Sequence, residues 1–152
     1  MRLTLHTDFA LRILMSLAVA GERLVTIEEL ARRHRLPKNH LMKIARSLTG
    51  IGVVDGVRGR SGGLRLARPA AQIRIGRVVR DLEPLALVAC QGSKPEGCVL
   101  VGACGLTAAL DRAMEAFFAE LDGVTLRDVV AERRGLRERL GLDTPEPAQP
   151  LA

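Results

Sequence analysis

Three cysteines stand close together in the second half of the chain, in a stretch that also holds proline and several glycines. Cys90, Cys98 and Cys104 are separated by seven and five residues, whereas structural zinc sites usually pair cysteines about two to four residues apart. A nucleophilic cysteine needs a neighbouring base, yet all three histidines lie within the first 40 residues. Soft thiolates that converge from irregular backbone suit an iron–sulfur cluster, so this spacing predicts one.

Two other roles for the same thiols stay open. Free cysteines behave as small apolar side chains and are often simply buried. Three thiols in one loop also suit a redox switch that exchanges disulfides and binds no metal. The odd number of cysteines argues against the disulfide framework of a small secreted protein, so a reducing cytoplasm is the expected compartment.

The part of the chain before this loop is strongly basic. Residues 1–80 hold 16 Lys and Arg against 5 Asp and Glu (+11), residues 81–152 hold 7 against 12 (−5), and together they give the net charge of +6. Most of the cations are arginines, whose guanidinium binds phosphate and guanine through two hydrogen bonds. The basic half therefore predicts a polyanion-binding module. With three Phe and no Trp or Tyr, a module that stacks single-stranded bases on aromatic rings is not expected.

The elements of the basic half follow a recognisable order. The chain has 152 residues, of which 47% are hydrophobic, as in one compact domain or a small domain with an appendage. Apolar spacing and capping residues predict helices at 8–20, 26–34 and 38–48 and strands at 53–57 and 64–67. We expect a mainly α fold with a small β-hairpin wing. This is a winged helix-turn-helix over residues 1–83, with the helix-turn-helix at about 26–50 and the wing at about 53–67.

The second half is expected to hold the cluster and the dimer contact. A helix at 75–83 closes the first domain, and residues 84–104 are the irregular cluster-binding loop. A long helix over 105–122 carries an apolar stripe made of Leu106, Leu110, Ala113, Met114, Phe117 and Leu121. A helix-turn-helix that reads a palindrome needs a two-fold partner, so residues 105–135 are interpreted as a homodimer contact, with intramolecular core as the alternative. Residues 143–152 are expected to be a disordered tail.

Polar residues of the third helix and the hairpin are candidates for DNA contacts. A helix that enters the major groove places polar side chains near its amino end. Arginines at a tip of small residues suit phosphates or a narrow minor groove. The candidates are Lys38, Asn39, His40, Lys43 and Arg46 in the helix and Arg58, Arg60 and Arg65 around the hairpin tip. A merely solvated basic face is the alternative.

Other classes of function receive no support. No apolar stretch reaches the roughly 20 residues of a membrane-spanning helix, and no membrane partner is expected. Residues 13–20 end like a signal-peptide cleavage site, but the apolar run is short, so no signal peptide is expected. No acid–base constellation accompanies the cysteines, and no enzymatic activity is expected.

Several motifs together resemble a known family, the winged-helix iron–sulfur transcriptional regulators that include IscR and NsrR. The resemblance covers nearly all of residues 1–135. Its carriers are residues 1–12, 39–43 (NHLMK), 58–67 (RGRSGGLRLA), the three cysteines with 103–106 (ACGL), and 121–130 (LDGVTLRDVV). The family implies a DNA-binding homodimer with an iron–sulfur cluster on the cysteines.

Within the family the sequence is most similar to the nitric-oxide-sensing NsrR type. Members of the IscR type carry a histidine ligand three residues after the last cysteine, where this chain has Thr107. Members of the NsrR type can use an aspartate near the start of the first helix, donated by the partner subunit, and Asp8 stands at that position with Arg12 as a supporting residue. A helix cap with an i,i+4 ion pair is the alternative for these two residues.

The resemblance therefore implies a repressor that nitric oxide releases from operator DNA. A 4Fe–4S cluster is favoured over 2Fe–2S, because three thiolates and a carboxylate leave one iron open to exchange. Two alternatives are kept: a regulator of the same fold that senses iron, cluster status or redox stress, and the metal-free thiol–disulfide switch.

Overall fold

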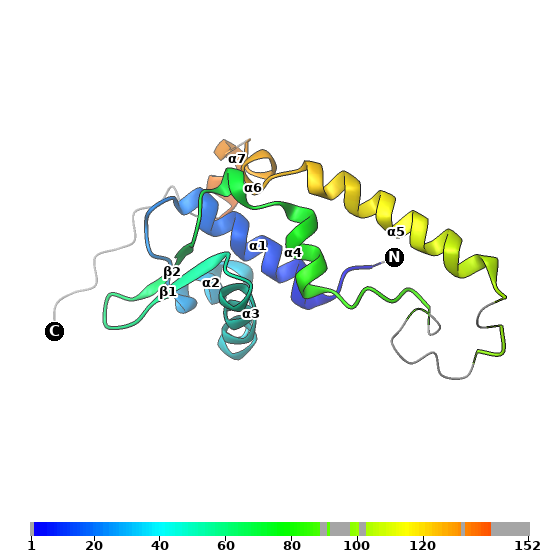
Figure 1. Ribbon diagram of the computed structural model, residues 1–152. Coiled ribbons are helices and arrows are strands. Elements are labelled where there is room, and N and C mark those ends of the chain that lie inside the picture. The colour runs from blue at the N-terminus through cyan, green and yellow to red at the C-terminus, as the bar shows by residue number, and fades with distance from the viewer. Residues whose placement is uncertain (1, 89–90, 92–97, 101–102, 132, 141–152) are drawn as a thin grey trace.

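The computed structural model describes residues 2–88, 91, 98–100, 103–131 and 133–140 (Figure 1). Its elements are α1 (Leu5–Ala20), α2 (Ile27–His34), α3 (Lys38–Gly50), β1 (Val54–Val57), β2 (Gly63–Leu66), the 3-10 helix η1 (Ala70–Gln72), α4 (Ile75–Leu82), α5 (Gly105–Gly123), α6 (Leu126–Val129) and α7 (Arg133–Arg139). The predicted fold class, mainly α with a β-hairpin wing, is confirmed. Figure 1 shows the hairpin on one side of the molecule and α5 extending from the other. Of the helices described, none has the length and apolar character needed to span a bilayer.

Helix α1 is the central element of the packed unit. The side chains that it buries most deeply are Ala10, Ile13, Leu14 and Leu17. The helix contacts α3, β2, α4, α6 and α7. It begins at Leu5, earlier than predicted, because the Thr4 hydroxyl accepts a hydrogen bond from the Thr7 N–H and caps the helix. Thr7 is itself buried, so neither it nor Asp8 is the cap.

The connection between α2 and α3 is the tight turn that the sequence predicts. Arg35 adopts a left-handed conformation with φ of 53°, and the Leu36 N–H donates to the Ala31 carbonyl. Pro37 then stands at the N-cap of α3, where its missing N–H costs no helical hydrogen bond. The turn and the proline together allow α3 to start abruptly at Lys38.

The wing is a two-stranded antiparallel hairpin, paired from Val54 with Leu66 to Val57 with Gly63. A further bridge joins it to the chain before α2: the Val25 N–H donates to the Leu64 carbonyl and the Leu64 N–H to the Val25 carbonyl. A Cβ atom at Gly63 would lie 2.9 Å from the Val25 carbonyl oxygen, so only glycine allows this close approach. The base of the wing is therefore tied to the helix-turn-helix.

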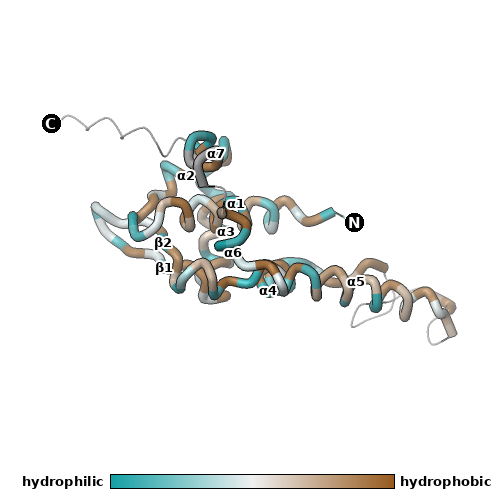
Figure 2. The backbone as a smooth tube through the Cα atoms, turned by 90° about the horizontal axis from the view of Figure 1, so that it is seen from above, coloured by the Kyte–Doolittle hydropathy of each residue, from teal (hydrophilic) through white to brown (hydrophobic). Residues whose placement is uncertain are grey.

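The carboxyl-terminal part of α5 is anchored to α4. Arg80 of α4 forms an ion pair with Asp122 of α5 (2.6 Å), and its guanidinium lies 4.3 Å from the centre of the Phe118 ring. Thr125 and Asp128 form a capping box at the start of α6. Figure 2 shows α5 continuing past α4, away from the rest of the molecule, with hydrophobic segments along its length.

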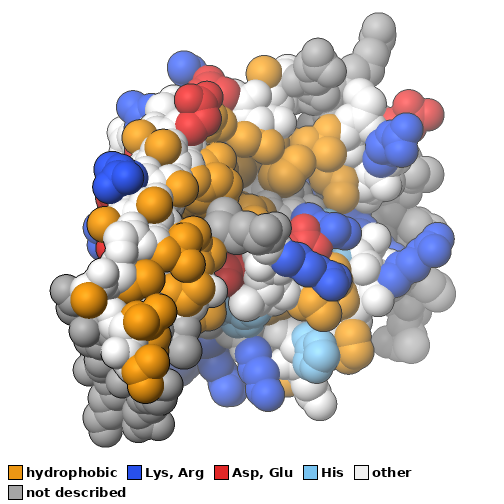
Figure 3. Space-filling model, turned by 90° about the vertical axis from the view of Figure 1, so that its right-hand side faces the viewer, with side chains coloured by type: hydrophobic (Ala, Val, Ile, Leu, Met, Phe, Trp, Pro, Cys, Tyr) orange, Lys and Arg blue, Asp and Glu red, His pale blue; other side chains and the backbone are white. Residues whose placement is uncertain are grey.

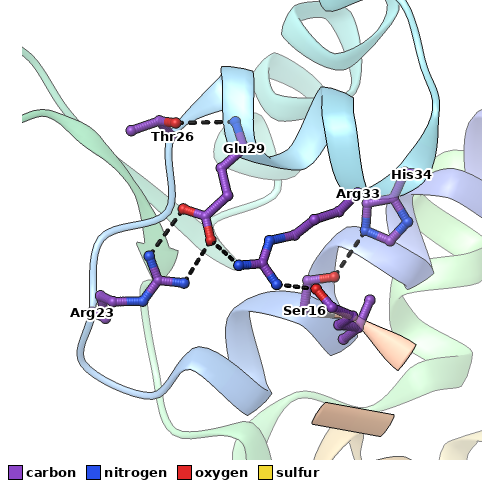
Figure 4. A network of polar contacts seen from close by, with 7 residues as sticks. Ser16, Arg23, Thr26, Glu29, Arg33 and His34 are labelled. Atoms are coloured by element: carbon purple, nitrogen blue, oxygen red, sulfur yellow. Dashed lines mark hydrogen bonds and ion pairs between the residues drawn. The ribbon is translucent and has the colours of Figure 1, made fainter. Parts of the chain in front are cut away.

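A buried carboxylate holds α2 in place (Figure 4). Glu29 accepts hydrogen bonds from both terminal nitrogens of Arg23 (2.9 and 2.7 Å), and Arg33 Nη2 lies 2.6 Å from the same carboxylate. The Thr26 hydroxyl accepts from the Glu29 N–H, which is half of the capping box that Thr26 and Glu29 could form. The Glu29 side chain turns to the two arginines instead of completing the box. The α2 cap is therefore joined to an ion-pair network.

Replacing Glu29 with alanine is expected to lower the free energy of unfolding by about 3 kcal/mol, because the substitution leaves the mostly buried Arg33 guanidinium without a carboxylate, with only the Leu140 carbonyl, of the described groups, still accepting from it. Chemical denaturation followed by far-ultraviolet circular dichroism measures the loss, since the chain has no Trp or Tyr for fluorescence. The control is Glu28→Ala, which removes an exposed carboxylate one residue earlier and should change stability little. Equal losses in both variants would contradict the assignment.

The same network predicts an acid-sensitive part of the stability. Hydrogen bonding from Arg23 holds the pKa of Glu29 below its ordinary value of 4.5. The contribution of Glu29 is therefore complete above about pH 4.5 and is lost as the pH falls through the lower, folded-state pKa. The free energy of unfolding of the wild-type protein should fall by this contribution on acidification. Glu29→Ala lacks the contribution at every pH, so its free energy of unfolding should depend less on pH in the acid range.

Candidate nucleic-acid interface and cysteine loop

Helix α3 separates a buried face from an exposed polar face. The side chains that it buries are Leu41, Ile44, Ala45 and Leu48. All five predicted contact residues of this helix, namely Lys38, Asn39, His40, Lys43 and Arg46, are exposed. Periodicity places them on the outer side because the apolar stripe must face α1 and α2. Their contacts with DNA stay a prediction, but the geometry leaves this face free for a partner.

Lys38 is tethered in a way that the sequence did not reveal. Its ammonium group lies 2.8 Å from a carboxylate oxygen of Glu28, and both side chains are more than half exposed. The hydrogen bond from Lys38 lowers the pKa of Glu28. The pair joins the start of α2 to the start of α3, so Lys38 is held at the amino end of α3 and a phosphate would compete with Glu28 for it.

The wing arginines occupy two different places. Arg58 and Arg60 lie in the tip between β1 and β2, and both are exposed. Arg65 lies within β2, where it is exposed and stands opposite Asp55 of β1. The tip therefore carries two arginines beside small residues, whereas Arg65 lies along the side of the hairpin. Figure 3 shows a gathering of Lys, Arg and His side chains at the lower edge of the molecule, the side on which α3 lies in Figure 1.

The apolar stripe of α5 is only partly covered by the residues that the structure describes. Phe118 is the one buried residue of the helix, and Leu106 is 60% exposed. The other predicted members of the stripe are half-buried, apart from the exposed Ala113. Figure 3 shows hydrophobic side chains running as a strip along one side of the face toward which α5 extends. Exposed apolar area of this kind is characteristic of a contact with another protein surface.

Two of the three cysteines lie in the described part of the chain. Cys98 and Cys104 are free, half-buried thiols, and Cys104 is the N-cap residue of α5 without a side-chain capping bond. Cys90 lies outside the described residues. The residues that the structure describes contain no group of three or more His, Cys, Asp or Glu side chains that could hold a metal ion. The donor set, three thiols within fifteen positions of sequence, fits the soft ligands of an iron–sulfur cluster.

Asp8 lies in the first turn of α1 and is bound to Arg12. Arg12 Nε and Nη2 lie 3.0 and 2.7 Å from the two carboxylate oxygens, and the guanidinium stacks 5.3 Å from the centre of the Phe9 ring. The Asp8 side chain is 38% exposed. Within one chain this is the i,i+4 ion pair, and its exposed carboxylate is accessible to a second subunit.

Two side-chain hydrogen bonds connect α1 with the helix-turn-helix. His6 Nε2 lies 3.1 Å from the Ser47 hydroxyl of α3, and Ser16 Oγ lies 2.8 Å from His34 Nε2 of α2 (Figure 4). Burial, with the nearby charges of Arg12 and Arg33, lowers the pKa of His34. Sequence reasoning missed these contacts.

The sequence contains a weak signal for the contact of Ser16 with His34. Asp8, Arg12 and Ser16 follow one another at i,i+4 spacing and form one line along α1. The Ser16 hydroxyl donates to the Arg12 carbonyl (3.0 Å). Nothing in the pattern, however, predicts which residue of a distant helix the line would meet.

Comparisons with known proteins agree with this architecture. The sequence matches the Rrf2 family, described as an iron-dependent transcriptional regulator, over residues 3–132. The structure of T. potens IscR is similar at 23% identity and a TM-score of 0.69, covering 90% of this chain and 91% of that chain. CymR (YrzC), the global cysteine regulator of B. subtilis, is similar at 25% identity and a TM-score of 0.70, covering 87% and 98%.

A third structure, the oxidised form of Staphylococcus aureus CymR, is similar at 24% identity and a TM-score of 0.66, covering 85% of this chain and 95% of that chain. These likenesses extend over nearly the full length of each protein and include the winged helix. Since the family match covers well over half of the sequence, the chain belongs to the Rrf2 family of transcriptional regulators.

Proposed function

We propose that this protein is a homodimeric DNA-binding repressor that holds an iron–sulfur cluster on Cys90, Cys98 and Cys104 and that nitric oxide releases from operator DNA. One observation carries the proposal. Helix α1 presents the exposed Asp8 carboxylate in its first turn and bonds through His6 and Ser16 to both helices of the helix-turn-helix. A change at Asp8 is therefore transmitted to the DNA-reading helix by direct contacts.

DNA recognition is assigned to the exposed face of α3 and to the wing tip. The amino-terminal polar residues of α3 (Lys38, Asn39 and His40) would reach base edges in the major groove, with Lys43 and Arg46 further along the helix. The tip arginines would bind phosphates or enter the minor groove, with Arg65 beside them. A two-fold dimer through α5 would set the two copies of α3 about one helical turn of DNA, or a multiple, apart.

The cluster ligands are assigned to the three cysteines and to Asp8 from the partner subunit, with Arg12 orienting the carboxylate. When bound, a cluster of the favoured 4Fe–4S type supplies an iron that lacks a thiolate, which a hard carboxylate holds weakly and a small diffusible ligand can reach. When Asp8 loses this partner, its carboxylate has only Arg12 to bind, and the restraint between the two subunits at α1 disappears. His6 and Ser16 then carry the relaxation of α1 to α3 and α2.

A second candidate function is a thiol–disulfide switch without metal. Cys98 and Cys104 are free thiols, and the similar structure of Staphylococcus aureus CymR is of an oxidised form. The family description, an iron-dependent regulator, favours the cluster, and it also keeps open a sensor of iron or cluster status.

An anaerobic absorption spectrum with iron and sulfide counts, followed by nitric oxide addition, tests the proposal. The polypeptide has no Trp or Tyr and absorbs weakly near 280 nm, so a brown cluster would dominate the spectrum. DNA affinity is measured on duplexes selected from a random pool by the anaerobic protein. Colourless, iron-free protein after reconstitution would favour the thiol switch. Unchanged DNA affinity after complete reaction of the cluster with nitric oxide would exclude nitric oxide as the signal.

Asp8→Ala is expected to shorten the lifetime of the cluster under an iron chelator without changing the unfolding midpoint, because the carboxylate is exposed and its ion pair contributes little to folding. Visible absorbance under anaerobic conditions measures the lifetime. Arg12→Gln is the control: it breaks the same ion pair and keeps the carboxylate. If both variants lose the cluster at equal rates, the ion pair and not the ligand role explains the effect.

The double variant Arg58→Ala/Arg60→Ala is expected to weaken binding to duplex DNA of any sequence and to reduce the slope of log affinity against log salt by about 2, since each lost phosphate contact releases about 0.9 fewer counterions. Fluorescence anisotropy of a labelled duplex at several salt concentrations measures this slope. Arg112→Ala, an exposed arginine of α5, is the control and should leave the slope unchanged.

Leu106→Glu is expected to weaken the dimer at least about tenfold, because it puts a charge on the exposed apolar stripe of α5 without touching the core of one chain. Sedimentation velocity at micromolar concentration measures the oligomeric state. Ala119→Glu places the same charge on the opposite, exposed side of the helix and should leave the dimer intact. A wild-type monomer would contradict the assignment of α5 as the interface.

A further inference from the structure

The side-chain amide of Gln91, the residue directly after Cys90, forms hydrogen bonds through both its oxygen and its nitrogen. Gln91 Oε1 accepts hydrogen bonds from the N–H groups of Leu87 (2.8 Å) and Val88 (3.1 Å). Gln91 Nε2 donates to the carboxylate of Asp111 (2.7 Å). The two backbone N–H groups can only donate, so the amide orientation follows from chemistry: its oxygen faces the chain and its nitrogen faces α5.

These bonds join the two ends of the cysteine loop. Asp111 lies on α5 seven positions after Cys104, the residue that caps this helix. Seven residues complete nearly two turns, about 10 Å of rise, so Asp111 lies on the same side of α5 as Cys104. The contact therefore ties the chain next to the first cysteine to the helix that begins at the third cysteine. We call this contact, Gln91 to Asp111, the loop clamp.

We propose that Gln91 and Asp111 are positioning residues that hold the first cysteine of the loop near the third for cluster binding, an assignment that rests on the function proposed above. Without the clamp, cluster binding would have to order this part of the loop itself, at a cost in conformational entropy. With it, part of the ordering is present before iron binds. Partners outside the ligand set orient metal ligands in the same way, and their loss weakens metal binding.

The clamp lies at the surface, which separates its effect on the cluster from any effect on folding. Gln91 and Asp111 line a cavity of about 490 Å³ together with Arg80, Glu115 and Phe118. The hydrogen bond between them is exposed, and an exposed bond contributes little to global stability. Its loss should appear in the retention of iron and not in the unfolding midpoint.

An exchange of donor and acceptor tests the clamp. Gln91→Glu keeps an oxygen for the N–H groups of Leu87 and Val88 but sets a second carboxylate against Asp111, so the clamp opens. Asp111→Asn keeps an acceptor for the Gln91 amide and should be close to wild type. In Gln91→Glu/Asp111→Asn the amide stands on α5 and the carboxylate beside Cys90, which restores the bond and the original net charge.

The measurement is the rate at which an iron chelator bleaches the visible absorbance of the reconstituted full-length protein without oxygen, with iron counts and far-ultraviolet circular dichroism in parallel. Gln91→Glu should lose the cluster about tenfold faster than wild type, and the double variant should recover most of that loss. Glu115→Gln, which changes a carboxylate on the wall of the same cavity, is the matched control and should behave as wild type.

The outcomes separate this assignment from the function on which it rests. If wild type holds iron and Gln91→Glu loses it at the wild-type rate, the clamp has no positioning role. If the double variant is as poor as Gln91→Glu, the added carboxylate beside Cys90 and not the broken bond explains the loss, and the assignment is wrong. Wild-type protein that retains no iron overturns the proposed function, and the assignment with it.

Discussion

The burial of α1 is the constraint on which the rest of the structure depends. Its apolar face packs against α3, β2, α4, α6 and α7, so all of these elements are positioned by one helix. Close-packed interiors resist small displacements, and a helix held on so many sides moves with its neighbours or not at all. Near its start, the side chains of Asp8 and, one turn later, Arg12 are partly exposed and form an ion pair with each other. Under the proposed function, a change in what Asp8 binds would reach α3 through this packing.

The two halves of the molecule, which the sequence distinguishes by their net charge, present different kinds of surface. The exposed side of α3 and the wing tip carry cations, whereas the uncovered side of α5 is apolar. Clustered cations attract a polyanion, whereas exposed apolar area is characteristic of a contact with another protein surface. Because α5 is anchored to α4 by Arg80, Asp122 and Phe118, the distance between two DNA-reading helices in a dimer depends on this joint.

Periodicity and turn chemistry were sufficient to predict the fold. Apolar spacing locates each main helix, and glycines mark the wing, because these signals arise within one element. The short elements η1 and α7 were not predicted. The errors at the helix starts have a common cause in side chains that choose among competing partners. Thr4 caps α1 ahead of the expected start, and Glu29 leaves its capping box for two arginines. Capping residues are visible in a sequence, but the alternative partner comes from another element.

The candidate site was likewise predicted in part from the sequence and in part only from the structure. Thiols and arginines are recognised by residue type, so they could be named as candidates from the sequence. The contacts of His6 with Ser47 and of Gln91 with Asp111, in contrast, join ordinary polar residues that lie 41 and 20 positions apart. Such contacts leave no periodic trace, and each contributes too little to folding to be inferred from stability. Regulated proteins need links of this strength, because an element that must move cannot be held as firmly as the core. Under the proposed function, the deep packing of α1 would transmit a change, while the exposed bonds at Asp8 and Gln91 are weak enough to be made and broken by it.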